Sequence, residues 1–132
     1  MADFKITRDD YFPSPPEKRD YGIGIIGCGG IVRGAHLPAY QTCGYRVIAC
    51  CDLEEADARV AAEKFNIPVY SLRLEDVLNH PEVEIIDLGV HATQRLPLIA
   101  QIAAAPRKPR AILSQKPFAM NYDDAARMVE LC

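Results

Sequence analysis

Apolar and polar residues alternate along the chain in two patterns, one typical of buried strands and one typical of helices. Short apolar runs predict five strands, at Tyr21–Gly27, Tyr45–Cys51, Val69–Tyr70, Val83–Val90 and Arg110–Ser114. The segments between them predict helices over Ile31–Tyr40, Glu54–Asn66, Leu72–Asn79, Thr93–Ala104 and the stretch after Asn121. This alternation predicts an α/β fold, with a doubly wound and mostly parallel sheet that helices cover on both faces.

Side chains that accept hydrogen bonds stand at the start of three predicted helices. We expect Ser71, Thr93 and Asn121 to cap these helices, because their oxygens can accept a free backbone N–H of the first turn. Acidic residues follow at Asp76 and Asp123, where the helix dipole favours negative charge.

Residues 1–20 differ from the remainder of the chain. Pro13, Pro15 and Pro16 restrict the backbone and predict an extended or polyproline-like arm. We interpret this arm as a leader or linker. The alternative is an arm whose aromatic side chains, Tyr11 and Phe12, pack on this or another subunit. Residues 21–132 are expected to form one domain.

Composition and charge narrow the possible functions. The chain has 132 residues, 49% of them hydrophobic and 25% charged, which is typical of a single globular domain. A net charge of −3 argues against nucleic acid as a partner. No apolar stretch approaches the roughly 18 residues of a membrane helix, and the first residues lack the apolar core of a secretory signal. Five cysteines without a C-x-x-C pair favour reduced thiols in the cytoplasm over a metal site or disulfides.

The most specific local motif is a glycine-rich turn between the first predicted strand and helix. In the sequence GCGGIV, Gly27 permits the tight turn and Gly29 allows close approach of a diphosphate, with Gly30 and Ile31 opening the helix. This context predicts a Rossmann fold that binds a dinucleotide. Val32 occupies the position where such motifs usually have a small third residue, and we expect Gly30 to relieve part of the crowding.

A carboxylate follows the second predicted strand. Asp52 lies roughly 20 residues beyond the glycine turn, where an acidic residue accepts hydrogen bonds from the adenosine ribose hydroxyls. It would repel a 2′-phosphate, so Asp52 favours NAD over NADP. The alternative is that Asp52 caps the helix near Glu54, and the two roles are compatible.

Three blocks of sequence resemble the Gfo/Idh/MocA oxidoreductase family. They are GIIGCGGIVRGAHLPAY at Gly24–Tyr40, VEIIDLGVHAT at Val83–Thr93, and SQKPFA at Ser114–Ala119, which is similar to the family's E-K-P motif. The resemblance implies an N-terminal NAD(P)-binding Rossmann domain, here without the C-terminal α/β domain that shapes the substrate site. It also implies hydride transfer between nicotinamide and a sugar, cyclitol or polyol carbon.

The resemblance assigns roles to individual residues. Lys116 matches the family's catalytic lysine, which lies near nicotinamide and substrate, and a cis bond to Pro117 is expected. Gln115 replaces the usual glutamate, so it supplies no charge beside Lys116. Thr93 is expected to face the nicotinamide ribose, although Gln94 departs from the family pattern at this point.

Three further polar residues are interpreted as structural. We expect Arg95 on a solvated helix face, with contact to a phosphate or acidic substrate as the alternative. We expect His91 to make ordinary hydrogen bonds at a strand end, the alternative being a place near nicotinamide. His36 is expected to pack by the glycine turn.

Two questions of assembly and activity stay open at this point. The competing hypothesis to a dehydrogenase domain is a non-catalytic nucleotide-binding or interaction module on the same scaffold. We also expect a homo-oligomer, because the strand Arg110–Ser114 presents an open sheet edge that favours pairing with another chain, unless the N-terminal arm covers it.

Overall fold

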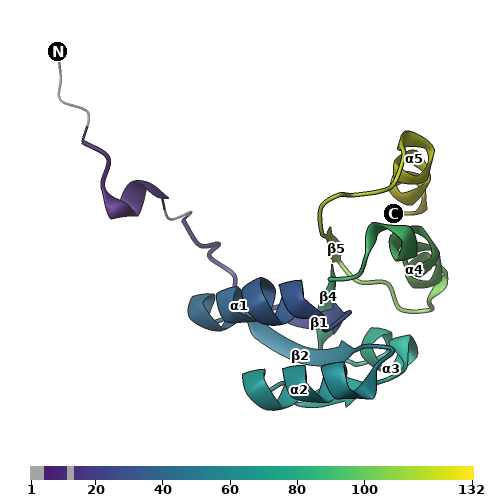
Figure 1. Cartoon of the computed structure of the whole chain (residues 1–132), viewed down its shortest axis with the longest axis horizontal. Helices are drawn as coiled ribbons and strands as arrows, with labels where there is room; N and C mark the ends of the chain where they lie inside the picture. The colour runs from purple at the N-terminus through teal and green to yellow at the C-terminus, as the bar shows by residue number, and fades with distance from the viewer. Residues whose placement is uncertain (1–4, 12–13) are drawn as a thin grey trace.

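A computed structural model describes residues 5–11 and 14–132, and within them strands and α-helices alternate (Figure 1). The strands are β1 (Gly22–Ile26), β2 (Arg46–Cys51), β3 (Val69–Ser71), β4 (Val83–Leu88) and β5 (Ala111–Ser114). The helices are α1 (Leu37–Cys43), α2 (Glu55–Phe65), α3 (Leu74–Leu78), α4 (Ala92–Ala104) and α5 (Tyr122–Leu131). A π-helical segment, η2 (Val32–His36), runs directly into α1. The predicted α/β fold is confirmed.

All strands run parallel in one sheet with the order β3-β2-β1-β4-β5. The central strand β1 is buried at every residue and pairs with β2 on one side and β4 on the other. The strand order changes direction at β1, so the loops that follow β1 and β4 diverge. A crevice therefore opens at the carboxyl ends of these strands, the usual ligand site of such sheets.

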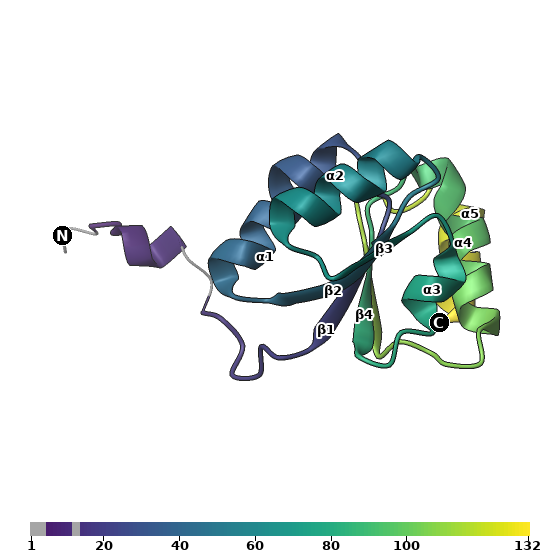
Figure 2. The ribbon, with the colours of Figure 1, turned by 90° about the horizontal axis from the view of Figure 1, so that it is seen from below.

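Helices cover both faces of the sheet and form two apolar cores. The segment η2–α1 and helix α2 pack on one face, where Ile25, Val32 and Ala61 are buried. Helices α3, α4 and α5 pack on the other face, around residues such as Ile86 and Ile99 (Figure 2). This double cover explains why β1 is apolar and buried at every residue and why the last three residues of β4 are buried.

Two of the expected helix caps have a different structure. Ser71 ends β3, and its hydroxyl accepts the Arg73 N–H at 3.0 Å, so α3 begins after Arg73 without a side-chain cap. The residue that caps α4 is His91, whose ring nitrogen accepts the N–H of Thr93. The third prediction is confirmed, because Asn121 Oδ1 accepts the Asp124 N–H at 2.8 Å at the start of α5.

The N-terminal segment extends away from the domain (Figures 1 and 2). It contains a short 3₁₀ helix, η1 (Arg8–Tyr11), so the prediction of a wholly extended arm is wrong there. Tyr11 is 74% exposed, whereas Phe12 and Pro13 lie outside the described residues. Within residues 14–20 there is no strand that pairs with β5.

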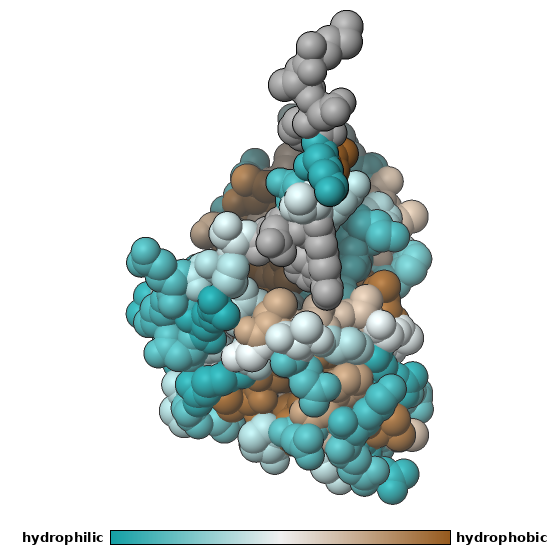
Figure 3. Space-filling model, turned by 90° about the vertical axis from the view of Figure 1, so that its left-hand side faces the viewer, coloured by the Kyte–Doolittle hydropathy of each residue, from teal (hydrophilic) through white to brown (hydrophobic). Residues whose placement is uncertain are grey.

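The surface mixes polar and apolar side chains. On the side from which the arm leaves, apolar surface lies among hydrophilic side chains (Figure 3). In the part of the chain that the structure describes, no helix has both the length and the apolar character needed to cross a membrane.

Candidate functional site

The glycine-rich turn joins β1 to η2 at the carboxyl edge of the sheet. Gly27 has a φ of 90°, which disfavours other residues, and its N–H donates to Cys51 O at 2.9 Å. A Cβ at Gly27 would lie 2.7 Å from a methyl group of Val90. Both the backbone angle and the packing therefore require glycine at this position.

The middle of the turn is open to solvent. A Cβ built at Gly29 or Gly30 would meet no heavy atom within 4 Å, and Ile31 is 47% exposed. The backbone N–H groups at the start of the following helix have no partners within that helix. An uncovered backbone at a helix N-terminus suits the diphosphate of a dinucleotide.

The bulky Val32 is accommodated by a glycine on another strand. Val32 is fully buried, and a Cβ at Gly89, just after β4, would lie 2.1 Å from Val32 Cγ2. The expected relief from Gly30 is wrong, because Gly30 faces open space. The small residue that close packing requires is therefore Gly89, and the helix still approaches the sheet closely.

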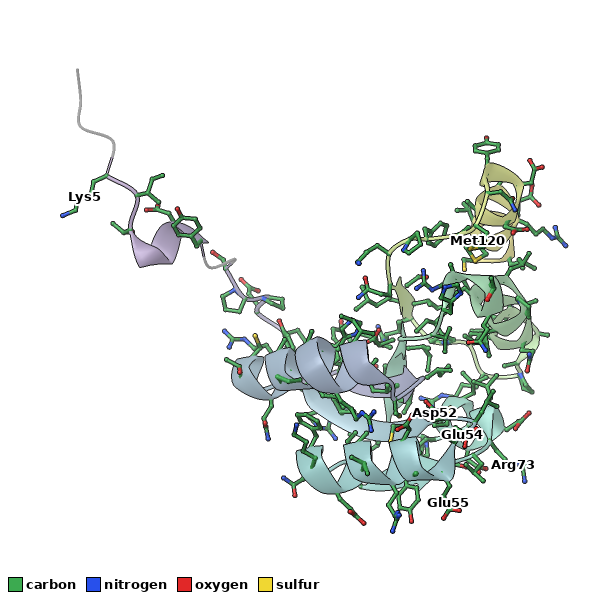
Figure 4. All side chains as sticks on the ribbon, viewed as in Figure 1. Lys5, Asp52, Glu54, Glu55, Arg73 and Met120 are labelled. Carbon is green, nitrogen blue, oxygen red and sulfur yellow. The ribbon has the colours of Figure 1, made fainter. Side chains whose placement is uncertain are left out.

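Asp52 lies immediately after β2 and connects to the glycine turn. Its Oδ2 accepts the Cys28 N–H at 2.6 Å, and its Oδ1 accepts the Glu54 N–H at 3.0 Å. Glu54 is the N-cap residue of α2. Asp52 therefore fixes the backbone just before this helix, by accepting the Glu54 N–H, but it is not the cap itself. Figure 4 shows Asp52 and Glu54 close together at the end of β2.

A cleft of about 570 Å³ joins these features at the carboxyl ends of β1, β2 and β4. Its walls include the glycine turn at Gly27 and Gly29, the carboxylates of Asp52 and Glu54, and the side chain of Thr93. The remaining lining is mostly apolar. It comes from the last residues of β1 and β2, from the segment that leads into α3, from the residues just after β4, and from α4. Among the residues that the structure describes, no lysine, arginine or histidine lines this cleft. The shape and the chemistry fit a nicotinamide dinucleotide.

Thr93 lies in the first turn of α4 and faces the cleft. Its hydroxyl is 3.1 Å from the His91 ring nitrogen that also accepts its N–H. The expectation that Thr93 caps α4 is wrong, but its place beside the cleft fits the expected role near a ribose. His91 makes these local hydrogen bonds, as expected, and does not line the cleft.

Arg95 is buried, so the expected solvated position is wrong. Its side chain is only 2% exposed, and its guanidinium donates to the carbonyl groups of Val90, Gln115, Pro117 and Phe118. Burial lowers its pKa. Arg95 thus fastens the loop after β5 to the start of α4.

Lys116 stands in this loop, just after β5. Its side chain is exposed at the same edge of the sheet as the glycine turn, outside the lining of the cleft. The Lys116–Pro117 bond is cis, as expected. The Lys116 N–H donates to Gln115 Oε1 at 2.7 Å.

Sequence reasoning missed two residues that shape this site, Gly89 and Asp87, and misplaced a third, Arg95. Asp87 on β4 is fully buried, and its Oδ2 lies 2.7 Å from His36 Nδ1. A buried aspartate in an apolar strand was the available signal, because a carboxylate is rarely buried without partners.

The five cysteines are free thiols, and three of them lie next to the site. Cys28 is buried within the glycine turn, and its hydrogen bond to Cys50 together with burial raises its pKa. Burial raises the pKa of Cys51 to about 12. Cys28 and Cys51 therefore stay protonated near neutral pH and contribute packing.

Comparison with known proteins identifies the family. The profile of the Gfo/Idh/MocA oxidoreductases, described as an oxidoreductase family with an NAD-binding Rossmann fold, matches residues 21–132. The chain belongs to this family. The family confirms the prediction of an NAD-binding Rossmann domain, and the cleft described above lies within the matched residues.

Individual relatives support the assignment and show its extent. The chain is 32% identical over 114 residues to protein YMR315W of Saccharomyces cerevisiae, covering 83% of this chain and 32% of that protein. It is 30% identical over 109 residues to D-apiose dehydrogenase of Paraburkholderia graminis, covering 82% of this chain and 28% of that protein. The WlbA dehydrogenase of Bordetella pertussis, solved with NADH and UDP-GlcNAcA, has a TM-score of 0.74 at 26% identity over 89% of this chain and 34% of that chain. The chain therefore spans about a third of these relatives' length.

Proposed function

We propose that residues 21–132 bind NAD in preference to NADP and serve a dehydrogenase that acts on a hydroxyl-bearing carbon of a sugar, cyclitol or polyol. Residues 1–20 are proposed as a separate arm. The named activities of the relatives support this substrate class, since one is a D-apiose dehydrogenase and another was solved with UDP-GlcNAcA. Free cysteines suit a reducing compartment, which favours the cytoplasm.

The charge of the cleft carries the preference for NAD. Asp52 and Glu54 line the cleft together, and no cationic side chain in the described part of the chain lines it. A carboxylate accepts hydrogen bonds from ribose hydroxyls but repels a 2′-phosphate. Arg73, which stands between the cleft-lining residues Leu72 and Leu74, is 70% exposed and pairs with Glu75 at 3.7 Å.

Each part of the dinucleotide has residues of this chain that would hold it. The backbone from Gly27 to Ile31 would bind the diphosphate, and Asp52 the adenosine ribose. Thr93 would lie beside the nicotinamide ribose. Bound NAD supplies the hydride acceptor, and Lys116 would bind the substrate hydroxyl and move its proton.

Calorimetric titration with NAD and NADP in parallel tests the cofactor assignment. We expect saturable binding with NAD at least tenfold tighter than NADP. Asp52→Ala should weaken NAD binding at least tenfold, because the ribose loses a charged acceptor. The matched control is Asp123→Ala on the exposed surface of α5, which should bind NAD as the unchanged protein does. Equal affinity for both nucleotides, or no binding, would contradict the proposal.

Catalysis is tested separately in a longer chain that joins this domain to a C-terminal α/β domain of the family, because that domain shapes the substrate site, by following NADH absorbance with panels of sugars, cyclitols and polyols. Turnover that Lys116→Met abolishes, while NAD binding is retained, is the expected result for a dehydrogenase. NAD binding without turnover on any of these compounds would favour the alternative, a non-catalytic nucleotide-binding module.

A further inference from the structure

A hydrogen-bonded chain connects the buried interior of the domain to the backbone of Lys116. Asp87 Oδ2 lies 2.7 Å from His36 Nδ1, and it also accepts the Tyr40 hydroxyl at 2.8 Å. His36 Nε2 lies 2.7 Å from the Gln115 amide nitrogen, and Gln115 Oε1 accepts the Lys116 N–H at 2.7 Å. Three segments far apart in the sequence, η2–α1, β4 and the loop after β5, thus meet through polar side chains.

The backbone N–H of Lys116 sets the direction of every bond in this chain. A backbone N–H can only donate, so the Gln115 side chain must turn its oxygen toward Lys116. The opposite orientation would place two donors face to face. The Gln115 amide nitrogen therefore points to His36 Nε2, and an amide nitrogen also can only donate.

The protonation of His36 follows from this direction. Because Nε2 accepts a hydrogen bond, it carries no proton, and the single ring proton is on Nδ1, which donates to Asp87. Tyr40 acts as a second donor to the same carboxylate, and burial together with the charge of Asp87 raises the Tyr40 pKa. His36 is only 12% exposed at its side chain, and Asp87 is fully buried, so water competes little for these bonds.

We propose that Asp87, His36 and Gln115 position Lys116 through this one-directional chain, and that glutamine at 115 holds His36 as the neutral Nδ1–H tautomer. The part concerning Lys116 rests on the proposed function. Arg95 holds the carbonyl groups on either side of Lys116, so the backbone at Lys116 is fixed at both its N–H and its neighbouring carbonyls. The Cα of Lys116, from which its exposed side chain extends, is therefore held in place.

Gln115 therefore changes where charge lies without changing the net charge of the group. An ionised glutamate at 115 can only accept, so a hydrogen bond between it and His36 would require a proton on Nε2 as well as on Nδ1. The imidazolium would then lie between two carboxylates, with one net negative charge, as for neutral His36 and Asp87 alone. With Gln115, this negative charge is confined to Asp87 on β4.

Nitrogen NMR of the histidine rings tests the tautomer directly, and the chain provides internal references. The Nδ1 atoms of His80 and His91 accept the N–H groups of Glu82 and Thr93, so both rings should be Nε2–H tautomers when neutral. In ¹⁵N-histidine-labelled protein above pH 8, we expect one Nδ1–H and two Nε2–H patterns. His36→Gln should remove the Nδ1–H pattern. Three Nε2–H patterns, or a doubly protonated His36, would overturn the proposal.

Substitution of Gln115 tests the positioning of Lys116. We expect NAD to shift the ¹³Cε resonance of Lys116, and this shift should fall at least twofold in Gln115→Ala. Gln115→Glu should restore the shift, because its carboxylate also accepts the Lys116 N–H, and it should add a second proton to His36. The matched control is Gln41→Ala on the exposed face of α1, which should leave both signals unchanged.

The two experiments separate the possible failures. Absence of any NAD-induced change in the unchanged protein would contradict the proposed function and leave the His36 tautomer as an independent result. An equal Lys116 response in Gln115→Ala and the unchanged protein would overturn the positioning role. Thermal denaturation of each variant establishes that it is folded before these spectra are compared.

Discussion

The contact between Val32 and Gly89 shows how a departure from a motif is balanced by a second residue. The helix after the glycine turn packs closely on the sheet although its third motif position is a valine. Gly89 provides the space because it has no side chain. A Cβ at this position would overlap Val32 and lie 2.9 Å from Gly27 O. The two positions together hold one small and one large residue, which is what the packing requires.

This contact predicts a non-additive pair of substitutions. Gly89→Ala should lower the free energy of unfolding by about 1–3 kcal/mol, because the added methyl overpacks a buried contact. Val32→Ala should cost about 2 kcal/mol through the loss of two buried methyl groups. In the double variant we expect the cost of Gly89→Ala to fall by at least half, as measured by urea denaturation. Strictly additive costs would contradict direct contact between the two side chains.

The polar residues of the site differ in how far along the sequence their hydrogen-bond partners lie, and this distance decides whether they could be predicted. Asp52 was predictable, because its position after a strand and its distance from the glycine turn are local features of the sequence. The links of His36 to Asp87 and Gln115 span 51 and 79 residues, so no local pattern reports them. His36 was correctly placed near the turn, but its partners required the structure.

At the scale of elements, helix α4 and the loop after β5 are joined by one buried arginine. Within residues 5–11 and 14–132, no described carboxylate pairs with the Arg95 guanidinium, whose hydrogen bonds go to backbone carbonyls. One buried guanidinium thus donates to carbonyl groups on both sides of this contact, at Val90 before α4 and at Gln115, Pro117 and Phe118 after β5. The position of the Lys116 loop against α4 therefore depends on this side chain.

Removal of the guanidinium is expected to loosen this loop. Arg95→Met should lower the free energy of unfolding by about 2–3 kcal/mol, because several carbonyl groups lose their donor. Hydrogen exchange should increase at Lys116 and Phe118 more than in β1. Arg127→Met, an exposed arginine on α5 that pairs with Glu130, should change stability by no more than about 0.5 kcal/mol. Equal effects of the two substitutions would contradict a specific role of Arg95.

The sequence predicted the order of elements better than their ends. The strands and helices were predicted correctly because buried apolar runs and helical spacing are signals that repeat over several residues. Caps depend on a single side chain, and at α4 the ring of His91 competes successfully with Thr93 for this role. Arg95 was misplaced because its acceptors come from a loop some 20 residues further along the chain.

At the scale of the whole molecule, buried thiols connect the stability of the domain to pH. The folded pKa of Cys51 is about 12, above the ordinary thiol value of about 9. Between these values the unfolded chain loses the proton and the folded chain keeps it. Stability should therefore be fully present below pH 9 and fall above it by up to about 1.4 kcal/mol per pH unit for this thiol. Urea denaturation from pH 7 to 10.5 should show a shallower fall in Cys51→Ala, and parallel curves would contradict this assignment.

One of the two edges of the sheet, the β5 edge, lies beside an apolar groove. β5 is the last strand of the sheet, and Leu113 on it is 51% exposed. A groove of about 440 Å³ next to it is lined mainly by apolar and aromatic residues such as Tyr40 and Ile112, together with Pro16, Lys18 and Arg19 of the N-terminal arm, which leave β5 itself unpaired. An unpaired strand next to apolar surface favours pairing with another chain.

Self-association through β5 is therefore the prediction for the whole molecule. Sedimentation between about 10 µM and 500 µM should show a mass that rises with concentration, because β5 edges pair between copies. Leu113→Lys should shift this association to at least tenfold higher concentration, since charge on an edge strand opposes pairing. The matched control, Leu72→Lys, alters an exposed leucine that is 50% accessible and lies away from β5, and it should associate as the unchanged protein does. A monomer throughout this range, with rapid amide exchange along β5, would show that the edge does not pair.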